Sequence, residues 1–564
     1  MNFTKLTTCA LSSLLAACAG EKVFPMRDPM WRDADLDSVR AQCRVEATKA
    51  DPHHVACAPR VVPSRLYWDG MDNLVFRPLA ESLGVVVSGE AVDVNSFDEV
   101  PDSAWFTNRI GMHPMTADEV ARGACTPDQI LDPDGAADGS WVIDKGKSEG
   151  ASLGFRVVVP GKGKFMLKAE TVNDHPERQS AAAVIGAAIL HAAGYNTPCE
   201  QIVYVRPSVF KLTLGLTTKP NFGDEKPFDQ KALDAIIADS PKRDGRIRMS
   251  ASSWIPGYLI GPHDYEGTRD DDPNDVVPHQ DRRELRAMRV LSAWINRYDT
   301  RRGNTLDTWI ADTKDRPDSS PGHVIHYQLD TSETIGGVWP WDPLSRRLGD
   351  QYVIDWGYMA ADFITLGIAR RPWDAKVRAP GHEIFEYFTD ARFRPEDWRN
   401  AYPNAAYSRA TERDKAWMAR ILAHFTREMI DALAASAQFS DPSNATYLEH
   451  VLVGRLDRIL ERYLTRVSPI ADVSVTGDRL CGVDLAEQRR LRAPEAFHYA
   501  AQPIDGTPLA VTRGEGARVC VTLTHGTAPY VRVLVDDGVA KGKLVVHLYD
   551  LGARGFRIAG IERP

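Results

Sequence analysis

The sequence lacks the features that most quickly assign a chain to a class. Its 68 basic and 77 acidic residues give a net charge of −9, so there is no electrostatic signature of nucleic-acid binding. After the first twenty residues no apolar run is long enough to span a bilayer. No Cys-x-x-Cys pair is present, which argues against a structural zinc site. His-Glu-x-x-His and Walker motifs are absent, so the sequence signals of a zinc protease and of a P-loop enzyme are missing.

What is present describes a globular protein of several domains. Hydrophobic residues make up 43% of the chain and charged residues 26%, which is the balance of a folded protein. A single core rarely extends over 564 residues, so we expect two to four domains.

The first residues resemble a bacterial lipoprotein leader. One Lys precedes a short apolar run that ends in Leu-Ala-Ala followed by Cys18. The resemblance implies that residues 1–17 are a signal peptide and that Cys18 carries a lipid; the alternative is an ordinary signal peptide with an incidental Cys. The chain would then be anchored to the cell envelope facing the periplasm. Ala19 does not look like an inner-membrane retention signal, so the outer membrane is favoured.

The remaining cysteines are even in number, which favours disulfides in an oxidising compartment. Nearness in sequence favours Cys43–Cys57, and shared position in the C-terminal region favours Cys481–Cys520. The pair Cys125–Cys199 follows only by elimination.

The composition changes along the chain and suggests five segments after the leader. The pattern from 148 onward alternates like a β-sheet and gives the order strand, turn, strand, helix, strand. The predicted segments are an N-terminal arm at 18–62, an extension packing on the core at 63–147, a β-rich lobe at 148–215, a helical lobe at 216–468, and a β-sandwich-like domain at 469–564.

A lysine stands at the end of the second predicted strand of the β-rich lobe. Lys168 follows Phe-Met-Leu, and an ammonium group inside a sheet is costly unless it meets an anion. Phosphate oxygens are one such partner and a helix carboxylate is another. Glu177, nine residues later, opens the next predicted helix, where its first turn could face Lys168. The alternative is a solvent-facing lysine on an edge strand.

The stretch at residues 296–304, NRYDTRRGN, follows a segment with helical apolar spacing. It places Asp299 five residues before Asn304, and a second acidic residue, Asp330, closes a predicted strand further on. A loop with this spacing can turn a proton-accepting carboxylate and a metal-binding amide toward the same phosphate.

In this order, Lys168, Glu177, Asp299, Asn304 and Asp330 resemble the protein-kinase-like superfamily, most closely its atypical HipA-type, spore-coat CotH-type and secretory-pathway members. The resemblance implies an α+β fold with a bilobal kinase-like core, a β-rich small lobe and a helical large lobe. It also implies that Lys168 and Glu177 hold an ATP-like nucleotide, that Asn304 and Asp330 hold Mg²⁺ or Mn²⁺, and that Asp299 is the catalytic base. The reaction would transfer a phosphoryl or nucleotidyl group to an acceptor that the sequence does not identify.

A second function remains open from the sequence, and two other features have structural interpretations. Asp330 is followed by Thr and Ser in place of Phe-Gly, which favours a catalytically inactive, pseudokinase-like binding or scaffold lipoprotein of the envelope. The acidic turn at residues 98–109, DEVPDSAWFTNR, is interpreted as structural packing around Trp105. His323 and His326 lie three apart on a strand, point to opposite faces, and so do not form a metal pair.

Overall fold

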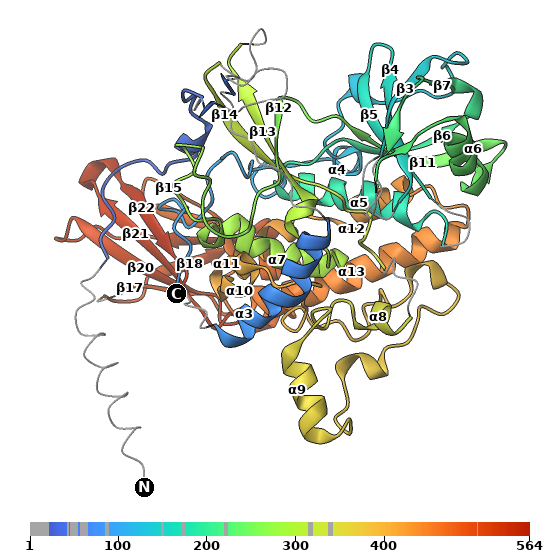
Figure 1. Cartoon of the computed structure of the whole chain (residues 1–564). Helices are drawn as coiled ribbons and strands as arrows, with labels where there is room; N and C mark the ends of the chain where they lie inside the picture. The colour runs from blue at the N-terminus through green and yellow to red at the C-terminus, as the bar shows by residue number, and fades with distance from the viewer. Residues whose placement is uncertain are drawn as a thin grey trace. The chain divides into compact units, whose positions relative to one another are not determined.

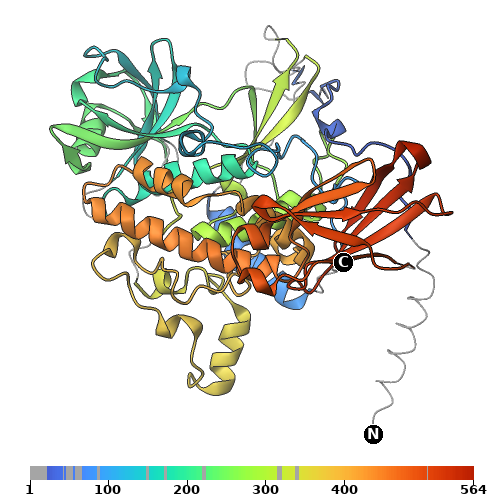
Figure 2. The ribbon, with the colours of Figure 1, turned by 180° about the vertical axis from the view of Figure 1, so that it is seen from behind.

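The structure is a computed structural model of the whole chain, shown in Figures 1 and 2. It describes residues 22–41, 44–45, 55–56, 66–84, 89–147, 152–170, 175–218, 224–313, 320–336, 342–504 and 506–564. The chain folds into two compact units. The first contains the C-terminal residues from Ile470 onward, together with described residues 22–30 and 95–99; the second contains residues 31–94 and 100–469. The fold is α+β, as expected.

The first unit has two antiparallel sheets of four strands. Side chains from both sheets, including Leu480, Val521, Val533 and Val546, share one hydrophobic core, so the expected sandwich-like arrangement is present. One sheet has the order β15 (Ile470–Thr476), β16 (Arg479–Asp484), β19 (Arg518–Thr522) and β18 (Ala510–Arg513); the other has β17 (Ala500–Pro503), β20 (Tyr530–Asp536), β21 (Leu544–Asp550) and β22 (Phe556–Glu562).

The second unit contains a seven-stranded mixed sheet with one long helix, α5 (Arg178–Ala193), packed against it. The strand order is β10-β11-β5-β4-β3-β7, and β6 also pairs with β11. Almost every residue of α5 is buried, because this Ala-rich helix lies between the sheet and other helices. The strands are β3 (Trp141–Gly146), β4 (Gly154–Val159), β5 (Gly163–Ala169), β6 (Glu200–Val205), β7 (Phe210–Leu212), β10 (Lys242–Arg243) and β11 (Arg246–Ser253).

This sheet extends beyond the predicted lobe at 148–215 on both sides. β3 comes from the segment predicted as an extension, and β11 from the segment predicted as helical. The apolar residues Ile247, Met249 and Ala251 of β11 alternate like a strand and enter the sheet core. They were missed because α6 (Gln230–Asp239) separates them from the other strands in the sequence.

The helical part of the second unit also carries a small antiparallel sheet. Its strands are β12 (Tyr258–Gly261), β13 (Thr305–Ala311) and β14 (Gly322–Gln328), and α7 (Arg283–Ile295) precedes β13. α7 ends where Asn296 adopts a left-handed conformation, which turns the chain into the loop of the sequence motif. The other helices are α2 (Leu66–Met71), α3 (Arg77–Leu83), α4 (Ala117–Arg122), α8 (Asp342–Arg347), α9 (Trp356–Thr365), α10 (Ala405–Arg409), α11 (Glu412–Leu422), α12 (Arg427–Ser436) and α13 (Pro442–Leu464).

Two of the three predicted disulfides are confirmed. Cys125–Cys199 joins the turn after α4 to the residue before β6, and Cys481–Cys520 joins directly opposed residues of β16 and β19. Cys18, Cys43 and Cys57 lie outside the described residues. Among the helices of the described ranges, none combines the length and the apolar character needed to cross a bilayer.

Candidate active site

Lys168 and Asp330 meet although 162 residues separate them in the chain. The Lys168 Nζ donates to Asp330 Oδ1 at 3.0 Å. The lysine comes from β5 of the large sheet, and the aspartate lies two residues beyond β14 of the small sheet. The Lys168 side chain is 16% exposed and that of Asp330 is 40% exposed, so the pair stands at a partly open position between two sheets.

Close packing against α5 holds the Asp330 segment in place. Thr331 Oγ1 donates to the carbonyl of Ala183 at 2.7 Å. A Cβ at Gly186 would lie 2.6 Å from Thr331 Cβ, so this helix position has no room for a side chain. Ser332 Oγ donates to Asp330 Oδ1 at 2.6 Å. α5 therefore holds the backbone next to Asp330, while Ser332 and Lys168 hold its side chain.

Two lysines act on Asp330. Burial opposes its ionisation, but Lys168, Ser332 and Lys147 outweigh burial and lower the Asp330 pKa. The pKa of Lys147, the residue after β3, falls to about 8 because of burial and the repulsion of Lys168. The sequence analysis missed Lys147. Together the two ammonium groups make this place suitable for phosphate oxygens.

Asp299 and Asn304 lie in the loop between α7 and β13, next to Asp330. The Asn304 Nδ2 donates to the backbone oxygen of Asp299 at 2.9 Å, and the Asn304 carbonyl accepts from Leu329 N at 2.9 Å. Burial and the charge of Asp330 raise the Asp299 pKa, against the attraction of Arg301. The amide nitrogen of Asn304 thus shapes the loop, which leaves its side-chain oxygen as the group for a metal.

Glu333 is a third carboxylate of the site, and the sequence analysis missed it. Burial and the charges of Asp299 and Asp330 raise its pKa to about 8. Its Oε2 and the Asp299 Oδ1 are buried and accept no hydrogen bond. The spacing Asp-x-x-Glu after a strand was the available signal, but such pairs are common in sequences.

Glu177 does not face Lys168, contrary to the prediction. Its carboxylate accepts from Ser440 N at 2.8 Å and from Arg243 at 3.2 Å. Glu177 has a left-handed backbone (φ 79°) and is the residue before α5, so its side chain points away from the sheet strand of Lys168. The charges of Asp330 and, to a smaller extent, of Glu200 on β6 raise the Lys168 pKa against the effect of burial.

The carboxylates fit a divalent cation in charge. Asp299 and Glu333 both have raised pKa values, and each has a buried oxygen that accepts no hydrogen bond, although Arg301 Nε lies 3.3 Å from that oxygen of Asp299. A cation between them would relieve that repulsion, and carboxylate and amide oxygens are the ligands that Mg²⁺ and Mn²⁺ prefer. Their oxygens are not already arranged around one metal position. Within the described ranges, only a different group of His, Cys, Asp or Glu residues has three ligand atoms within 4.8 Å of one another.

That other group consists of Asp307 on β13, His326 on β14 and His263 in the loop after β12. Asp307 Oδ1 accepts from Nδ1 of both histidines at 2.7 Å, and Oδ2 accepts from Arg269 at 2.9 Å. Two ligands of one tetrahedral zinc at the usual bond lengths stand more than 3 Å apart, roughly 3.3 Å. The shorter separations and the adjacent guanidinium indicate a hydrogen-bonded hub, which we call the histidine hub.

Trp105, from the acidic turn at residues 98–109, lies within this hub. Its ring stacks on His326 with centroids 3.5 Å apart and meets His263 and His279 edge-on. His326 points inward and His323 outward, as the sequence predicted. The structural interpretation of Trp105 is therefore confirmed, whereas its histidine partners were not foreseen because they are distant in the sequence.

Comparisons with known proteins found no match to this chain among family models, curated proteins or solved structures.

Proposed function

We propose that this chain is a metal-dependent phosphoryl- or nucleotidyl-transferase with an atypical protein-kinase-like core. We further propose that a lipid on Cys18 holds it in the cell envelope facing the periplasm, in the outer membrane rather than the inner. The Lys168–Asp330 ion pair carries the proposal, because it joins the strand lysine to the strand-ending aspartate that the kinase-like resemblance pairs through a nucleotide. The two disulfides agree with an oxidising compartment.

The residues then have distinct tasks. Lys168 and Lys147 bind phosphate oxygens, and Glu200 keeps Lys168 charged. Asp330 and Asn304, with Glu333 beside them, would hold Mg²⁺ or Mn²⁺. The metal supplies charge neutralisation at the phosphates when bound. Asp299 orients the acceptor hydroxyl and takes its proton; its raised pKa makes it a better base than an exposed aspartate.

A thermal-shift titration tests the nucleotide site. With Mn²⁺ and ATP, the wild-type chain should gain several degrees in Tm, and Asp330→Asn should lose most of that gain. Asp270→Asn, at an exposed aspartate of the same unit, is the matched control and should behave like wild type. No metal-dependent gain with ATP in the wild type would reject the proposal.

A transfer assay then separates an enzyme from a binding protein. Incubation with ATP labelled on the α- or the γ-phosphate, followed by mass measurement, detects nucleotidyl or phosphoryl transfer to the chain itself or to an envelope extract. Nucleotide-dependent stabilisation without any transfer would instead assign the second candidate, a pseudokinase-like binding or scaffold lipoprotein.

A further inference from the structure

The apolar surface of α9 is the most unusual exposed feature of the second unit. This helix projects from the helical part of that unit, and none of its residues is buried (Figures 1 and 2). Phe363 and Ile364 are 83% and 77% exposed, and in the turn that follows Leu366 and Ile368 are 86% and 82% exposed. Large apolar residues that gather at one exposed tip mark an interaction site.

The helix is ordered by contacts at its base, although its tip is free of them. The rings of Tyr358 and Trp373 pack edge to face with centroids 5.0 Å apart, and Arg371 donates to the carbonyl of Tyr358 at 3.0 Å. The only charged residue of α9, Asp362, pairs with the same arginine. A ten-residue helix is marginal in water by itself, so these contacts present a preformed and neutral apolar surface.

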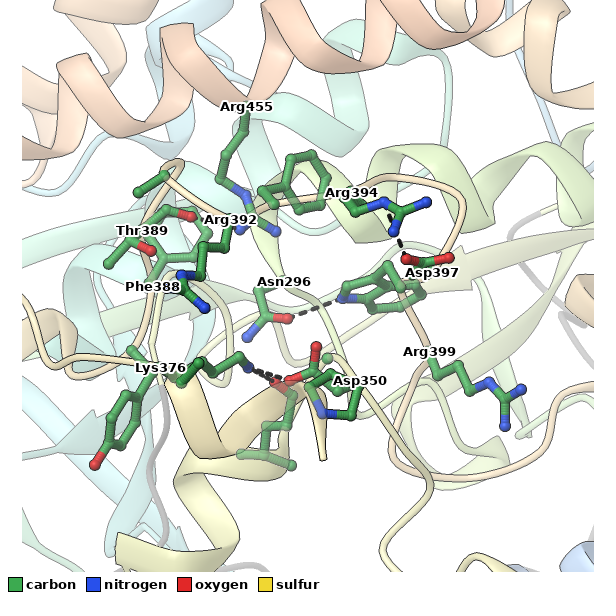
Figure 3. Close-up of a pocket in the computed structure, with 18 of the residues that line it drawn as sticks. Asn296, Asp350, Lys376, Phe388, Thr389, Arg392, Arg394, Asp397, Arg399 and Arg455 are labelled. Atoms are coloured by element: carbon green, nitrogen blue, oxygen red, sulfur yellow. Dashed lines mark hydrogen bonds and ion pairs between the residues drawn. The ribbon is translucent and has the colours of Figure 1, made fainter. Parts of the chain in front are cut away.

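A cationic pocket adjoins this helix. Its volume is about 730 Å³, and its lining includes residues 358, 372 and 375–377, which flank or belong to the α9 segment. Figure 3 shows Asp350, Lys376 and Arg392 among the lining residues. The lining includes seven Arg or Lys and three Asp or Glu residues. Each of the acidic side chains pairs with a lining cation: Asp350 with Lys376, and both Glu396 and Asp397 with Arg394.

Several cations of the pocket remain without a carboxylate. Arg455 is buried and donates to the backbone carbonyls of Ala293, Trp294 and Thr389, and burial lowers its pKa to about 9. No hydrogen-bond acceptor in the described ranges pairs with the Arg392 guanidinium. The pocket is therefore suited to an anion that bears several oxygens, such as a phosphate group.

We propose that α9 inserts into a bilayer that contains anionic phospholipid, and that the adjoining pocket binds the lipid headgroup phosphate. An apolar tip with arginine and lysine beside it is the combination that binds membrane surfaces. A second copy fits less well, because a two-fold contact through α9 would bring two cationic pockets together. This contact would act in addition to a lipid on Cys18 and does not depend on the proposed phosphotransfer.

Vesicle flotation tests the inference with the chain from Ala19 onward, which retains every described residue and lacks the lipidated cysteine. The wild type should float with vesicles of phosphatidylcholine and 30% phosphatidylglycerol, and less with phosphatidylcholine alone. Phe363→Asp and Leu366→Asp should each weaken binding about tenfold or more. Arg392→Glu should weaken it about fivefold, through lost attraction to the headgroups. The control Leu214→Asp, at a leucine that is 93% exposed elsewhere, should change nothing.

Two results would overturn the inference. One is flotation that is absent with both vesicle types or is unchanged by Phe363→Asp. The other is a wild-type dimer, seen by sedimentation in the absence of lipid, that Phe363→Asp converts to a monomer; a second copy would then cover α9.

Discussion

The second unit buries two ionic clusters on the small sheet, and they differ in how their charges are balanced. In the histidine hub, Asp307 accepts from two imidazoles and one guanidinium, and these donors lower its pKa well below the usual value despite burial. The second cluster consists of Asp299, Asp330 and Glu333 of the candidate site, and we call it the active-site cluster. In it, burial and mutual repulsion raise the pKa values of Asp299 and Glu333. A buried carboxylate whose two oxygens both accept from donors stabilises a fold, whereas carboxylates in excess of their donors are candidates for a ligand site.

Removing the central carboxylate of the histidine hub should produce the largest effect. Asp307→Asn removes one of the two carboxylates that pair with the buried Arg269, the other being Asp271, and one of the acceptors of His263 and His326. We expect the free energy of unfolding to fall by about 3–5 kcal/mol, measured by urea titration. The exposed Asp270→Asn serves as control, and an equal effect of the two substitutions would contradict the proposed role of the hub.

The matching substitution in the active-site cluster should act in the opposite direction. A carboxyl whose pKa is about 8 is mostly protonated at pH 7 in the folded chain and ionised in the unfolded one. Glu333→Gln removes the cost of that proton uptake, so the ligand-free protein should gain on the order of 1–3 kcal/mol at pH 7. The same urea titration measures it. A loss of stability in Glu333→Gln would mean that the glutamate is a structural group like Asp307, and the comparison between the clusters would fail.

The contributions of the two clusters to the free energy of unfolding should change with pH in opposite directions. Burial lowers the His326 pKa to about 4, so the unfolded chain binds more protons and the hub contribution falls as the pH drops from about 6.5 to 4. The raised pKa of Glu333, about 8, makes its contribution fall as the pH rises from about 4.5 to 8.

Urea titrations at several pH values test both signs. His326→Asn should flatten the acid limb, and Glu333→Gln should flatten the limb between pH 6.5 and 8, where His326 no longer titrates. If both variants keep the wild-type slope in these ranges, neither residue is responsible for it.

The smallest expected effect is proton release on metal binding. A cation beside Glu333 lowers the pKa of that carboxyl, so Mn²⁺ should release up to about one proton per chain at pH 7. Calorimetry in two buffers of different ionisation enthalpy measures it. Glu333→Gln should release less, whereas Asp270→Asn should match the wild type; equal release from Glu333→Gln would place the proton elsewhere.

The sequence was sufficient where local pattern and chain order define the structure. The β4–β5 hairpin, α5 and β6 follow from apolar alternation and an Ala-rich run, and the C-terminal strands follow from the same alternation. Asp299 and Asn304 were chosen from their spacing, and Lys168 and Asp330 from their places at strand ends and from the order of the resemblance; the structure brings these residues close together.

The parts that were missed depend on contacts between distant segments. The sequence analysis did not single out Glu200, and it chose Glu177 because of its position in the chain order. Backbone conformation decides which of two possible partners a side chain reaches. The left-handed conformation of Glu177 cannot be read from the residue pattern. The histidine hub is likewise built from β14, β13 and the loop after β12, whose meeting requires the folded small sheet.

The contact that displaced Glu177 has a consequence for control. In protein kinases the helix that follows the strand lysine moves to switch activity. Here the start of α5 is tied by Glu177 to Ser440, on the segment between α12 and α13, and to Arg243 on β10. Arg248 ties β11 to the carbonyls of Ala437 and Gln438 in the same segment. Any displacement of the start of α5 would therefore have to break its hydrogen bonds to Ser440 and its ion pair with Arg243.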